Sequence, residues 1–285
     1  MPSEGKAHSV LVTGCSSGIG YCVARGLKER GYRVVASARR QQDVERLREE
    51  GLDCLRLDLD DSESIRRAVE ELAERTGGRL YGLFNNAGYG QPGAIEDLDR
   101  ETLRRQFETN VFGTMELTRR ILPWMRAAGE GRIIQNSSVL GFVSLAYRGA
   151  YNASKYALEG LYDTLRLELA GSGIHAILIE PGPITSAFRN NAWAAYRRHI
   201  DREHSVHREQ YLAMERRLTQ AGAVVPFTLP PEAVLDKVVR ALESPRPRPR
   251  YYVTFPTWLF GTLKRVLSTR ALDRVLLRVS RDEQN

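Results

Sequence analysis

The segment Ser9-Val10-Leu11-Val12 leads directly into Thr13-Gly14-Cys15-Ser16-Ser17-Gly18-Ile19-Gly20. The apolar residues predict a buried strand, the glycines a tight turn, and the apolar spacing through Val23 and Leu27 a helix. In this context glycines let the backbone approach a pyrophosphate, and the helix N-terminus presents free N–H groups to it. An ordinary strand-to-helix turn is the alternative, because the spacing is Gly-x-x-x-Gly-x-Gly and not the commoner Gly-x-Gly-x-x-Gly. The residues expected to contact a dinucleotide here are Gly14, Ser16, Ser17, Gly18, Ile19 and Gly20.

Strand-like and helix-like segments then alternate along the chain. Further strands are expected at residues 32–38, 55–59, 80–84, 133–136, 176–179 and 251–255. Functional-looking residues follow just past the strand ends, which is typical of a parallel sheet that binds its ligand at its carboxyl edge. We therefore expect a single α/β domain over residues 1–285, a doubly wound Rossmann-type parallel sheet of about seven strands with helices on both faces.

Two arginines decide the expected cofactor. Arg39 and Arg40 close the second predicted strand, where an NAD site would place an acid for the ribose 2′-hydroxyl and where an arginine suits a 2′-phosphate. NADP(H) is therefore expected, with two solvated arginines as the alternative. Asp58 and Leu59 end the third strand, where the carboxylate can accept from the adenine amine. Small residues after the fourth strand would let the cofactor ribose pass; they are Asn86, Ala87 and Gly88.

Tyr151 and Lys155 stand four residues apart in a predicted helix and so share one face. An ammonium beside a phenol favours phenolate and is expected to lower the tyrosine pKa from its usual value of about 10. That makes a proton donor usable near neutral pH. A half-buried tyrosine with a stem-packed lysine is the alternative for this pair alone. Asn110 lies inside a helical region over residues 101–125, where a buried asparagine is usually a satisfied core amide or marks a bend.

Composition narrows the class of protein. The chain has 285 residues, 42% of them apolar, with 42 basic and 35 acidic side chains. The basic excess lies mainly in the last third and the aromatic-plus-basic modules of RNA-binding proteins are absent, so no nucleic acid partner is expected. Three cysteines without metal-ligand or framework spacing favour a reducing compartment. Since we find no apolar leader and no uncharged run of about 18 apolar residues, a cytoplasmic location is expected.

Together these motifs resemble the short-chain dehydrogenase/reductase family from about Val10 to Thr185. The matching segments are Thr-Gly-x-x-x-Gly-x-Gly at 13–20, Asn-Asn-Ala-Gly at 85–88, a serine at 138, Tyr-x-x-x-Lys at 151–155 and Pro-Gly at 181–182. The resemblance implies that Ser138 hydrogen-bonds the substrate carbonyl and that Tyr151 delivers the proton. It implies that Lys155 lowers the tyrosine pKa and holds the nicotinamide ribose, and that Asn110 supports a water linking Lys155 to solvent.

The same resemblance extends the expected cofactor site beyond the sixth strand. It implies that Arg39 meets the 2′-phosphate and that a segment after this strand positions the carboxamide and phosphates. The residues of that segment are Pro181, Gly182, Ile184 and Thr185. By family likeness, residues 101–127 and 151–170 form subunit contacts, so a homodimer or homotetramer is expected.

The last hundred residues are expected to determine the substrate. Residues 186–226 combine aromatic and charged side chains and predict a helical lid that excludes water from hydride transfer, with a peripheral helical bulge as the alternative. The histidines His199, His204 and His207 lack metal-site spacing and are expected to be solvated, and no metal site is predicted. A basic amphipathic helix is predicted over residues 257–280. It can lie on an anionic membrane, although packing on the domain or on a neighbouring subunit is favoured.

The C-terminal third is similar to bacterial NADP-dependent aldehyde reductases and, more distantly, to hydroxysteroid and retinol dehydrogenases. The expected function is NADP(H)-dependent hydride transfer between the nicotinamide and a carbonyl or alcohol of a fairly apolar small molecule, with aldehyde or ketone reduction favoured. Two alternatives stay open. One is a hydroxysteroid- or retinol-type dehydrogenase at a membrane surface, and the other is a non-catalytic NADP-binding regulatory protein on the same fold.

Overall fold

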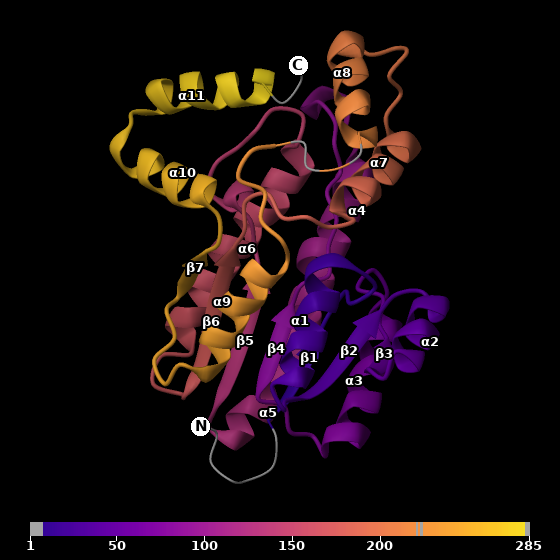
Figure 1. Cartoon of the computed structure of the whole chain (residues 1–285), viewed down its shortest axis with the longest axis vertical. Coiled ribbons are helices and arrows are strands. Elements are labelled where there is room, and N and C mark those ends of the chain that lie inside the picture. The colour runs from indigo at the N-terminus through magenta and orange to yellow at the C-terminus, as the bar shows by residue number, and fades with distance from the viewer. Residues whose placement is uncertain (1–7, 221, 223–224, 283–285) are drawn as a thin grey trace.

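A seven-stranded parallel sheet forms the centre of the computed structural model, which describes residues 8–220, 222 and 225–282 (Figure 1). The strand order is β3-β2-β1-β4-β5-β6-β7, and all neighbouring pairs are parallel. The strands are β1 (Ser9–Val12), β2 (Arg33–Ala38), β3 (Asp53–Arg56), β4 (Gly82–Asn85), β5 (Gly131–Asn136), β6 (Ile174–Glu180) and β7 (Arg250–Tyr252). The order reverses between β1 and β4, which creates a crevice at their carboxyl ends. The predicted doubly wound sheet is confirmed.

Helices cover both faces of the sheet. Successive side chains of each strand point to opposite faces, and the apolar side chains on both faces are buried. Val10 and Val12 point into one apolar cluster together with α1, α2 and α9, whereas Leu11 points into the opposite cluster with α3, α5 and α6. The helices of the first face are α1 (Gly18–Glu29), α2 (Gln41–Glu49) and α9 (Glu232–Glu243). Those of the second are α3 (Ser62–Thr76), α5 (Thr114–Ala128) and α6 (Gly149–Glu168). These two layers hold the strand ends rigidly around the crevice.

The helical region predicted over residues 101–125 contains a π-helical turn. Helix α4 (Arg100–Phe107) runs into η2 (Glu108–Gly113), which continues as α5. Gly113 permits this arrangement, since a Cβ there would lie 1.9 Å from the Leu59 carbonyl oxygen. The turn therefore packs directly on the loop that follows β3. Two short 3-10 turns, η1 (Ile95–Asp97) and η3 (Val139–Gly141), complete this part of the chain.

Two strands are displaced from their predicted bounds. The third was expected at 55–59 but ends at Arg56, so Asp58 and Leu59 lie in the loop beyond it. The seventh was expected at 251–255 but ends at Tyr252, because Pro256 lies in the first turn of a helix that begins at Phe255.

The predicted single helix over residues 257–280 is wrong, because the chain forms two helices there. Helix α10 (Phe255–Val266) is followed by Leu267, whose backbone is extended, and then by α11 (Thr269–Asp282). The apolar side of α11 packs against the domain in a cluster with Leu140 and Val143. Packing on the domain, the alternative favoured from the sequence, therefore accounts for the apolar stripe of α11.

The region of the predicted lid contains two helices above the carboxyl end of the sheet (Figure 1). They are α7 (Phe188–His199) and α8 (Arg208–Thr219), and they share a small apolar core of Tyr196, Tyr211 and Met214. Residues 221, 223 and 224 of that prediction, like both chain ends, lie outside the described residues. Within the described part of the chain, none of the helices has the length and apolarity needed to cross a bilayer.

Candidate functional site

A cavity of about 1090 Å³ lies at the carboxyl ends of the strands and under the lid helices. All but two of the predicted site residues line it, although they come from segments far apart in the chain. They are Gly14, Ser16, Ser17, Gly18, Ile19, Arg39, Arg40, Asp58, Leu59, Asn86, Ala87, Gly88, Ser138, Tyr151, Lys155, Pro181, Gly182, Ile184 and Thr185. The two residues that do not line it are Gly20 and Asn110.

The glycine turn is built by close backbone contact. Gly14 and Gly18 have φ values of +71° and +55°, which glycine adopts without strain. A Cβ on Gly14 would lie 2.8 Å from the Ala87 Cα atom, and one on Gly18 would lie 2.8 Å from Ser186. Gly20 faces inward instead, and a Cβ on it would lie 2.2 Å from the Gly14 carbonyl oxygen. Gly20 thus allows α1 to approach the turn, which explains its absence from the cavity wall.

The residues around this turn fit a dinucleotide pyrophosphate. Ser17 caps α1 without a side-chain hydrogen bond, so the first N–H groups of the helix are not satisfied by that side chain. Those N–H groups and the positive end of the helix dipole face the cavity, where they can bind an anion. The glycines leave room for phosphate oxygens against the backbone.

Amide side chains join the ends of three strands. Asn136 Nδ2 donates to Asn86 Oδ1 at 3.0 Å, and Asn86 Nδ2 donates to the Thr13 carbonyl oxygen at 2.9 Å. Thr13 Oγ1 accepts from the backbone N–H groups of Asn86 and Ala87, each at 2.9 Å. These bonds fix the crevice between β1, β4 and β5.

Arg39 and Arg40 both line the cavity beyond β2, but they differ in their partners. Arg40 Nε donates to Asp43 at 2.9 Å. Arg39 forms no ion pair with any residue in the described ranges, and its side chain is exposed. Arg39 is therefore the arginine available to an anion at this position, consistent with the expected 2′-phosphate contact.

Ser138, Tyr151 and Lys155 converge at the centre of the cavity, although Ser138 comes from the end of β5 and the other two from α6. A hydrogen bond joins Tyr151 to Ser138, and Ser138 Oγ also accepts from the Leu140 N–H at 3.1 Å. Lys155 Nζ donates to the Asn136 carbonyl oxygen at 2.7 Å and lies 5.6 Å from the centre of the Tyr151 ring. A hydroxyl, a phenol and an amine thus lie together in the cavity lining.

The predicted lowering of the Tyr151 pKa is not found in the structure. Burial raises the pKa of Tyr151 to about 12, opposed by the hydrogen bond with Ser138. Burial likewise lowers the pKa of Lys155 to about 8, opposed by the charge of Glu159. The lysine ammonium bonds a carbonyl oxygen instead of the phenol, and the phenol is enclosed, so desolvation outweighs the expected charge effect.

Phe188, the first residue of α7, provides that enclosure. Its ring packs edge-to-face on Tyr151 with 5.2 Å between ring centres. It also touches the backbone at Gly90, where an added Cβ would lie 2.8 Å from the Phe188 ring. Helix α7 therefore contacts the Tyr151 ring directly.

Asn110 lies in the π-helical turn, and protein groups satisfy its side chain. Its Nδ2 donates to the Tyr89 carbonyl oxygen and to Ser154 Oγ, each at 3.0 Å, and its Oδ1 accepts from the Tyr89 N–H at 3.1 Å. The side chain is thus the satisfied core amide that the sequence left as the common alternative. It fastens the strand-end loop at Tyr89 to helix α6, one residue before Lys155.

Polar contacts fasten the lid to the 91–97 segment. Asp97 accepts hydrogen bonds from Tyr211 and Ser205, and His207 contacts Glu96 at 2.5 Å. His199 Nδ1 contacts Gln91 Oε1 at 2.8 Å. The expectation that the histidines are solvated is therefore wrong for His199 and His207, which bridge the lid to the domain.

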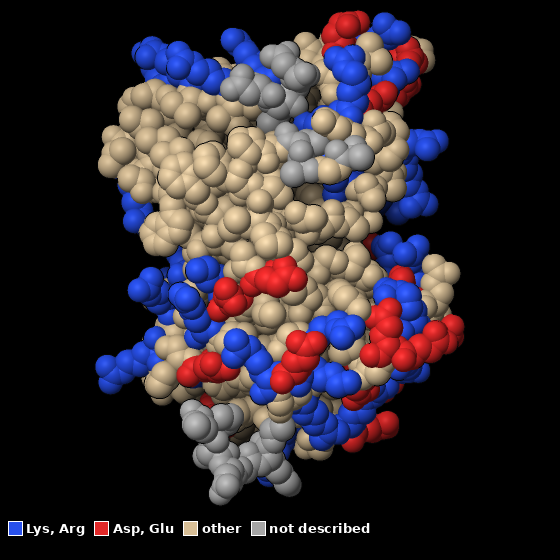
Figure 2. Space-filling model, viewed as in Figure 1, with Lys and Arg blue, Asp and Glu red and all other residues tan. Residues whose placement is uncertain are grey.

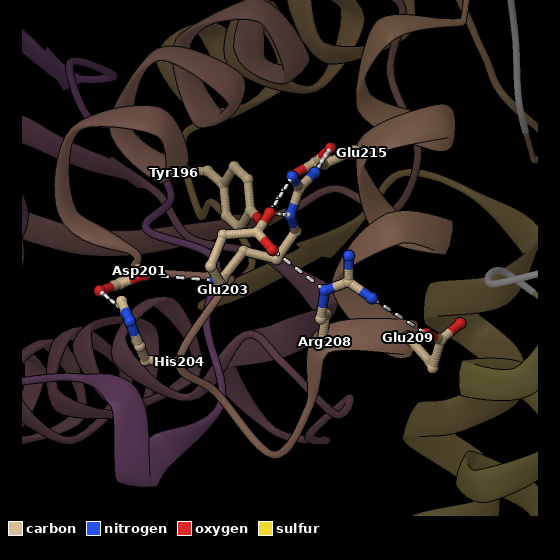
Figure 3. A network of polar contacts seen from close by, with 8 residues as sticks. Tyr196, Asp201, Glu203, His204, Arg208, Glu209 and Glu215 are labelled. Carbon is tan, nitrogen blue, oxygen red and sulfur yellow. Dashed lines mark hydrogen bonds and ion pairs between the residues drawn. The ribbon is translucent and has the colours of Figure 1, made fainter.

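Within the lid a second network is mostly exposed (Figure 3). Glu215 accepts from Tyr196 at 2.8 Å and pairs with Arg202 at 2.7 Å, while Glu203 links Arg202 to Arg208. His204 pairs with Asp201 at 2.7 Å and is exposed, as expected. This network holds the α7–α8 connection in shape and does not touch the cavity centre.

The sequence analysis missed a partly buried ionic cluster behind Lys155. Arg250 of β7 bonds the carboxylates of Glu159 and Glu180 and contacts Asp163 at 2.6 Å. Glu159 also accepts a hydrogen bond from Ser137. Burial and the neighbouring Glu159 charge raise the pKa of Glu180 to about 8. A carboxylate at position 159, four residues after Lys155 and next to the buried Leu158, was the one local sign of this cluster.

Taken together, a parallel sheet with a glycine turn at its switch point and a buried hydroxyl, phenol and amine define a dinucleotide-binding protein equipped for proton transfer. A family model described as short chain dehydrogenase matches residues 8–197. The protein therefore belongs to the short chain dehydrogenase family and is an oxidoreductase of that family. The resemblance inferred from the sequence is confirmed.

Individual relatives agree with this assignment. The chain is 45% identical over 268 residues to YbbO, an uncharacterized oxidoreductase of Escherichia coli strain K12, covering 94% of this chain and 93% of the relative. It is 32% identical over 274 residues to an NADPH-dependent 3-dehydrocapnine reductase of Ornithobacterium rhinotracheale, covering 93% and 94%. A solved short chain dehydrogenase from Burkholderia cenocepacia in complex with NADP is similar with a TM-score of 0.74 at 25% identity, covering 95% of this chain and 98% of that one.

Proposed function

We propose that the protein is an NADP(H)-dependent carbonyl reductase or alcohol dehydrogenase that acts on a fairly apolar aldehyde or ketone. The observation that carries this proposal is the convergence of Ser138, Tyr151 and Lys155 in one cavity with the glycine turn and with Arg39. The name of the Ornithobacterium relative and the NADP complex of the Burkholderia structure support the choice of cofactor.

The cofactor would lie between the glycine turn and the loop after β6. The α1 N-terminus would hold the pyrophosphate, Asp58 the adenine amine and Arg39 the 2′-phosphate. Ile184 and Thr185 would position the carboxamide and phosphates. When bound, the nicotinamide supplies or accepts the hydride.

The chain's own side chains then manage the substrate oxygen. Ser138 donates a hydrogen bond to the carbonyl oxygen and stabilises the negative charge that develops there. Tyr151 gives its proton to that oxygen, and the Lys155 ammonium stabilises the phenolate that remains. In the reverse direction Tyr151 takes the proton from an alcohol. The raised pKa of Tyr151 keeps the phenol protonated at neutral pH, as a proton donor requires.

The apolar lining of the substrate end supports the substrate class. Side chains of the lid, of η3 and of α10 contribute to this wall, to which the lid also adds Arg189, Arg198 and Arg217. The acidic residues Asp43, Asp58 and Asp60 belong to the opposite, adenosine end. The apolar lining residues include Leu140, Leu145, Phe188, Met214, Leu218, Leu259 and Phe260. Such a wall favours an apolar body around one carbonyl group. The intact Ser138, Tyr151 and Lys155 set favours an enzyme over a non-catalytic NADP-binding protein.

The test is NADPH and NADH oxidation with a panel of aldehydes and ketones, repeated with Arg39→Asp. We expect NADPH to be preferred by the natural protein and the variant to lose roughly ten- to hundredfold in NADPH affinity, since one charge-assisted bond contributes about 1.5–3 kcal/mol. Arg40→Asp is the matched control, and its effect should be smaller because Asp43 already pairs with Arg40. Unchanged cofactor preference in Arg39→Asp would refute the NADP assignment.

We also propose a homodimer or homotetramer in the cytoplasm. Exposed apolar side chains on the two expected contact segments support the oligomer; they are Phe112, Tyr156, Leu161 and Leu167. Sedimentation velocity of the purified protein would measure the state directly, and a monomer at micromolar concentration would contradict it.

A further inference from the structure

The part of the surface that the proposed reaction leaves unexplained is an apolar patch formed by α10 and the loop ahead of α9. Four of its residues are large and exposed: Phe227 (58%), Phe255 (56%), Trp258 (55%) and Leu259 (40%). Figure 2 shows this area as a continuous field without Lys, Arg, Asp or Glu. A charge-free apolar field of this kind commonly marks an interaction surface.

The patch is held in shape by ring contacts. Phe227 and Phe255 pack with 5.0 Å between ring centres, and Trp258 packs edge-to-face on Tyr252 at 4.9 Å. Phe227 has a φ of +60°, a backbone conformation that is rare for a phenylalanine. Both the backbone conformation of Phe227 and the exposure of its ring to water are unfavourable for folding. A residue that is kept in spite of such strain is typical of a functional position.

Basic side chains from α10 and α11 border the patch, four of them on α11. Residues 255–282 contain six basic side chains (Lys264, Arg265, Arg270, Arg274, Arg278 and Arg281) and two acidic ones, Asp273 and Asp282. Figure 2 shows basic side chains over α11, at the upper edge of the patch, whereas acidic side chains lie below the patch and, away from it, over α8. Since the apolar side of α11 is buried against the domain, its basic side chains face outward as a rim.

The patch also reaches the mouth of the cavity. Phe227, Phe255 and Leu259 belong both to the exposed field and to the cavity lining. An apolar molecule could therefore pass from whatever covers the patch into the cavity without crossing water.

We propose that this face docks on a lipid bilayer with anionic headgroups, with α10 and Phe227 entering the headgroup region and α11 contacting the lipid phosphates. Aromatic side chains that are exposed beside a row of arginines match the interface of an anionic bilayer, where rings lie at headgroup level and each nearby basic residue strengthens binding. A second copy of this chain is a poorer occupant. A twofold contact through the patch would bring two basic rims together, and like charges repel.

The experiment measures co-sedimentation of the full chain with vesicles of phosphatidylcholine alone and of phosphatidylcholine with roughly one-third phosphatidylserine. We expect binding to the anionic vesicles, weak binding to the neutral ones, and a blue shift of tryptophan emission that is lost in Trp258→Phe. Trp258→Ser should lower the partition coefficient roughly tenfold. The triple variant Arg270→Glu, Arg274→Glu, Arg278→Glu should lower it at least a hundredfold, since each basic residue near the surface contributes roughly a fivefold gain.

Matched variants outside the patch test whether vesicle binding depends on this face or only on the net charge and the exposed apolar side chains of the whole protein. Val206→Ser removes a side chain that is 83% exposed in the lid, and Arg79→Glu, Arg119→Glu, Arg126→Glu removes three exposed arginines away from the patch. Both should bind vesicles nearly as the natural protein does. Failure to sediment with anionic vesicles, or equal loss in the control variants, would overturn the proposal. So would an oligomer that Trp258→Ser dissociates, since a second copy would then cover the patch. Sedimentation requires no turnover, so this result is independent of the proposed reaction.

Discussion

The two ends of the cavity are held together by different kinds of contact. At the glycine turn the backbone lies directly against other segments, and a single Cβ would collide with the Ala87 backbone from Gly14 or with Ser186 from Gly18. At the lid, separate side-chain bonds make the connection, such as those from Tyr211 to Asp97 and from His207 to Glu96. Backbone contact cannot adjust to a new side chain, whereas side-chain bonds can be lost one at a time. The cofactor end is therefore rigid, and the substrate end is the part that can adapt.

The largest effect is expected where the two ends meet, at Tyr151. Tyr151→Phe removes the proton donor but keeps the ring that Phe188 packs against. Turnover should fall by roughly 10²- to 10⁴-fold, the usual contribution of a general acid, while NADPH affinity stays near normal. Steady-state kinetics and NADPH fluorescence titration measure the two quantities. Substantial residual turnover would exclude Tyr151 as the acid.

A glycine pair tests the rigid end. Gly14→Ala adds both a positive-φ strain and a contact at 2.8 Å with the Ala87 Cα atom, whereas Gly31→Ala adds strain at φ +86° with nothing within 4 Å. Strain at a positive φ costs about 1–3 kcal/mol, so both variants should lose that much stability in urea unfolding. Only Gly14→Ala should also weaken cofactor binding, by roughly tenfold or more. Equal cofactor affinity in the two variants would contradict a backbone-built site.

A tyrosine tests the adaptable end. Tyr211→Phe deletes the hydroxyl that donates to Asp97 and accepts from the Ala94 N–H at 2.9 Å. Leaving the buried Ala94 N–H unpaired costs about 1–3 kcal/mol, whereas Asp97 keeps its hydrogen bond from Ser205. We expect a raised KM for the carbonyl substrate with little change in the KM for NADPH. Glu209→Gln, at the exposed end of the lid network in Figure 3, is the control and should change neither constant. A raised NADPH KM in Tyr211→Phe would show that the two ends are not independent.

The smallest effect concerns pH. The Glu159 charge favours the protonated form of Lys155, whose pKa burial has lowered to about 8. Glu159→Gln removes that charge, so the Lys155 pKa should fall further and the alkaline decline of kcat/KM should begin at a lower pH. Asp163→Asn also touches the Arg250 cluster but is not a cause of the Lys155 shift, so its profile should stay in place. A shift toward higher pH in Glu159→Gln would contradict this sign.

The same contrast explains what could be predicted from the sequence. Glycine spacing, the Tyr-x-x-x-Lys pair and the strand ends depend on local backbone geometry, so the sheet and the cavity residues could be assigned before any coordinates. The Arg250 cluster could not, because Arg250 contacts Glu159 and Glu180 across 91 and 70 residues. The direction of the Tyr151 pKa was wrong for a related reason. Burial by Phe188 depends on how the lid folds back, and no local pattern records that contact.

The break between α10 and α11 was also invisible in the sequence. The apolar spacing continues across Leu267, and only the extended backbone there divides one predicted helix into two. That division turns α11 back onto the domain while α10 keeps an exposed face, and the apolar spacing of a single predicted helix could not show this difference.

The position of Arg250 in the last strand has a consequence for how the protein matures. During synthesis the motifs that define the reaction have all left the ribosome once Lys155 emerges, but the cation that balances Glu159, Asp163 and Glu180 follows 95 residues later in the numbering. Until β7 docks, the buried acids Glu159 and Glu180 lack their guanidinium, whereas Asp163 already pairs with Arg166. A chain that is shortened before β7 would thus contain all the sequence motifs of the site. It would still lack the positive charge that balances the acids next to Lys155 and to the Ser137–Ser138 loop, so we expect this part of the site to fold incompletely.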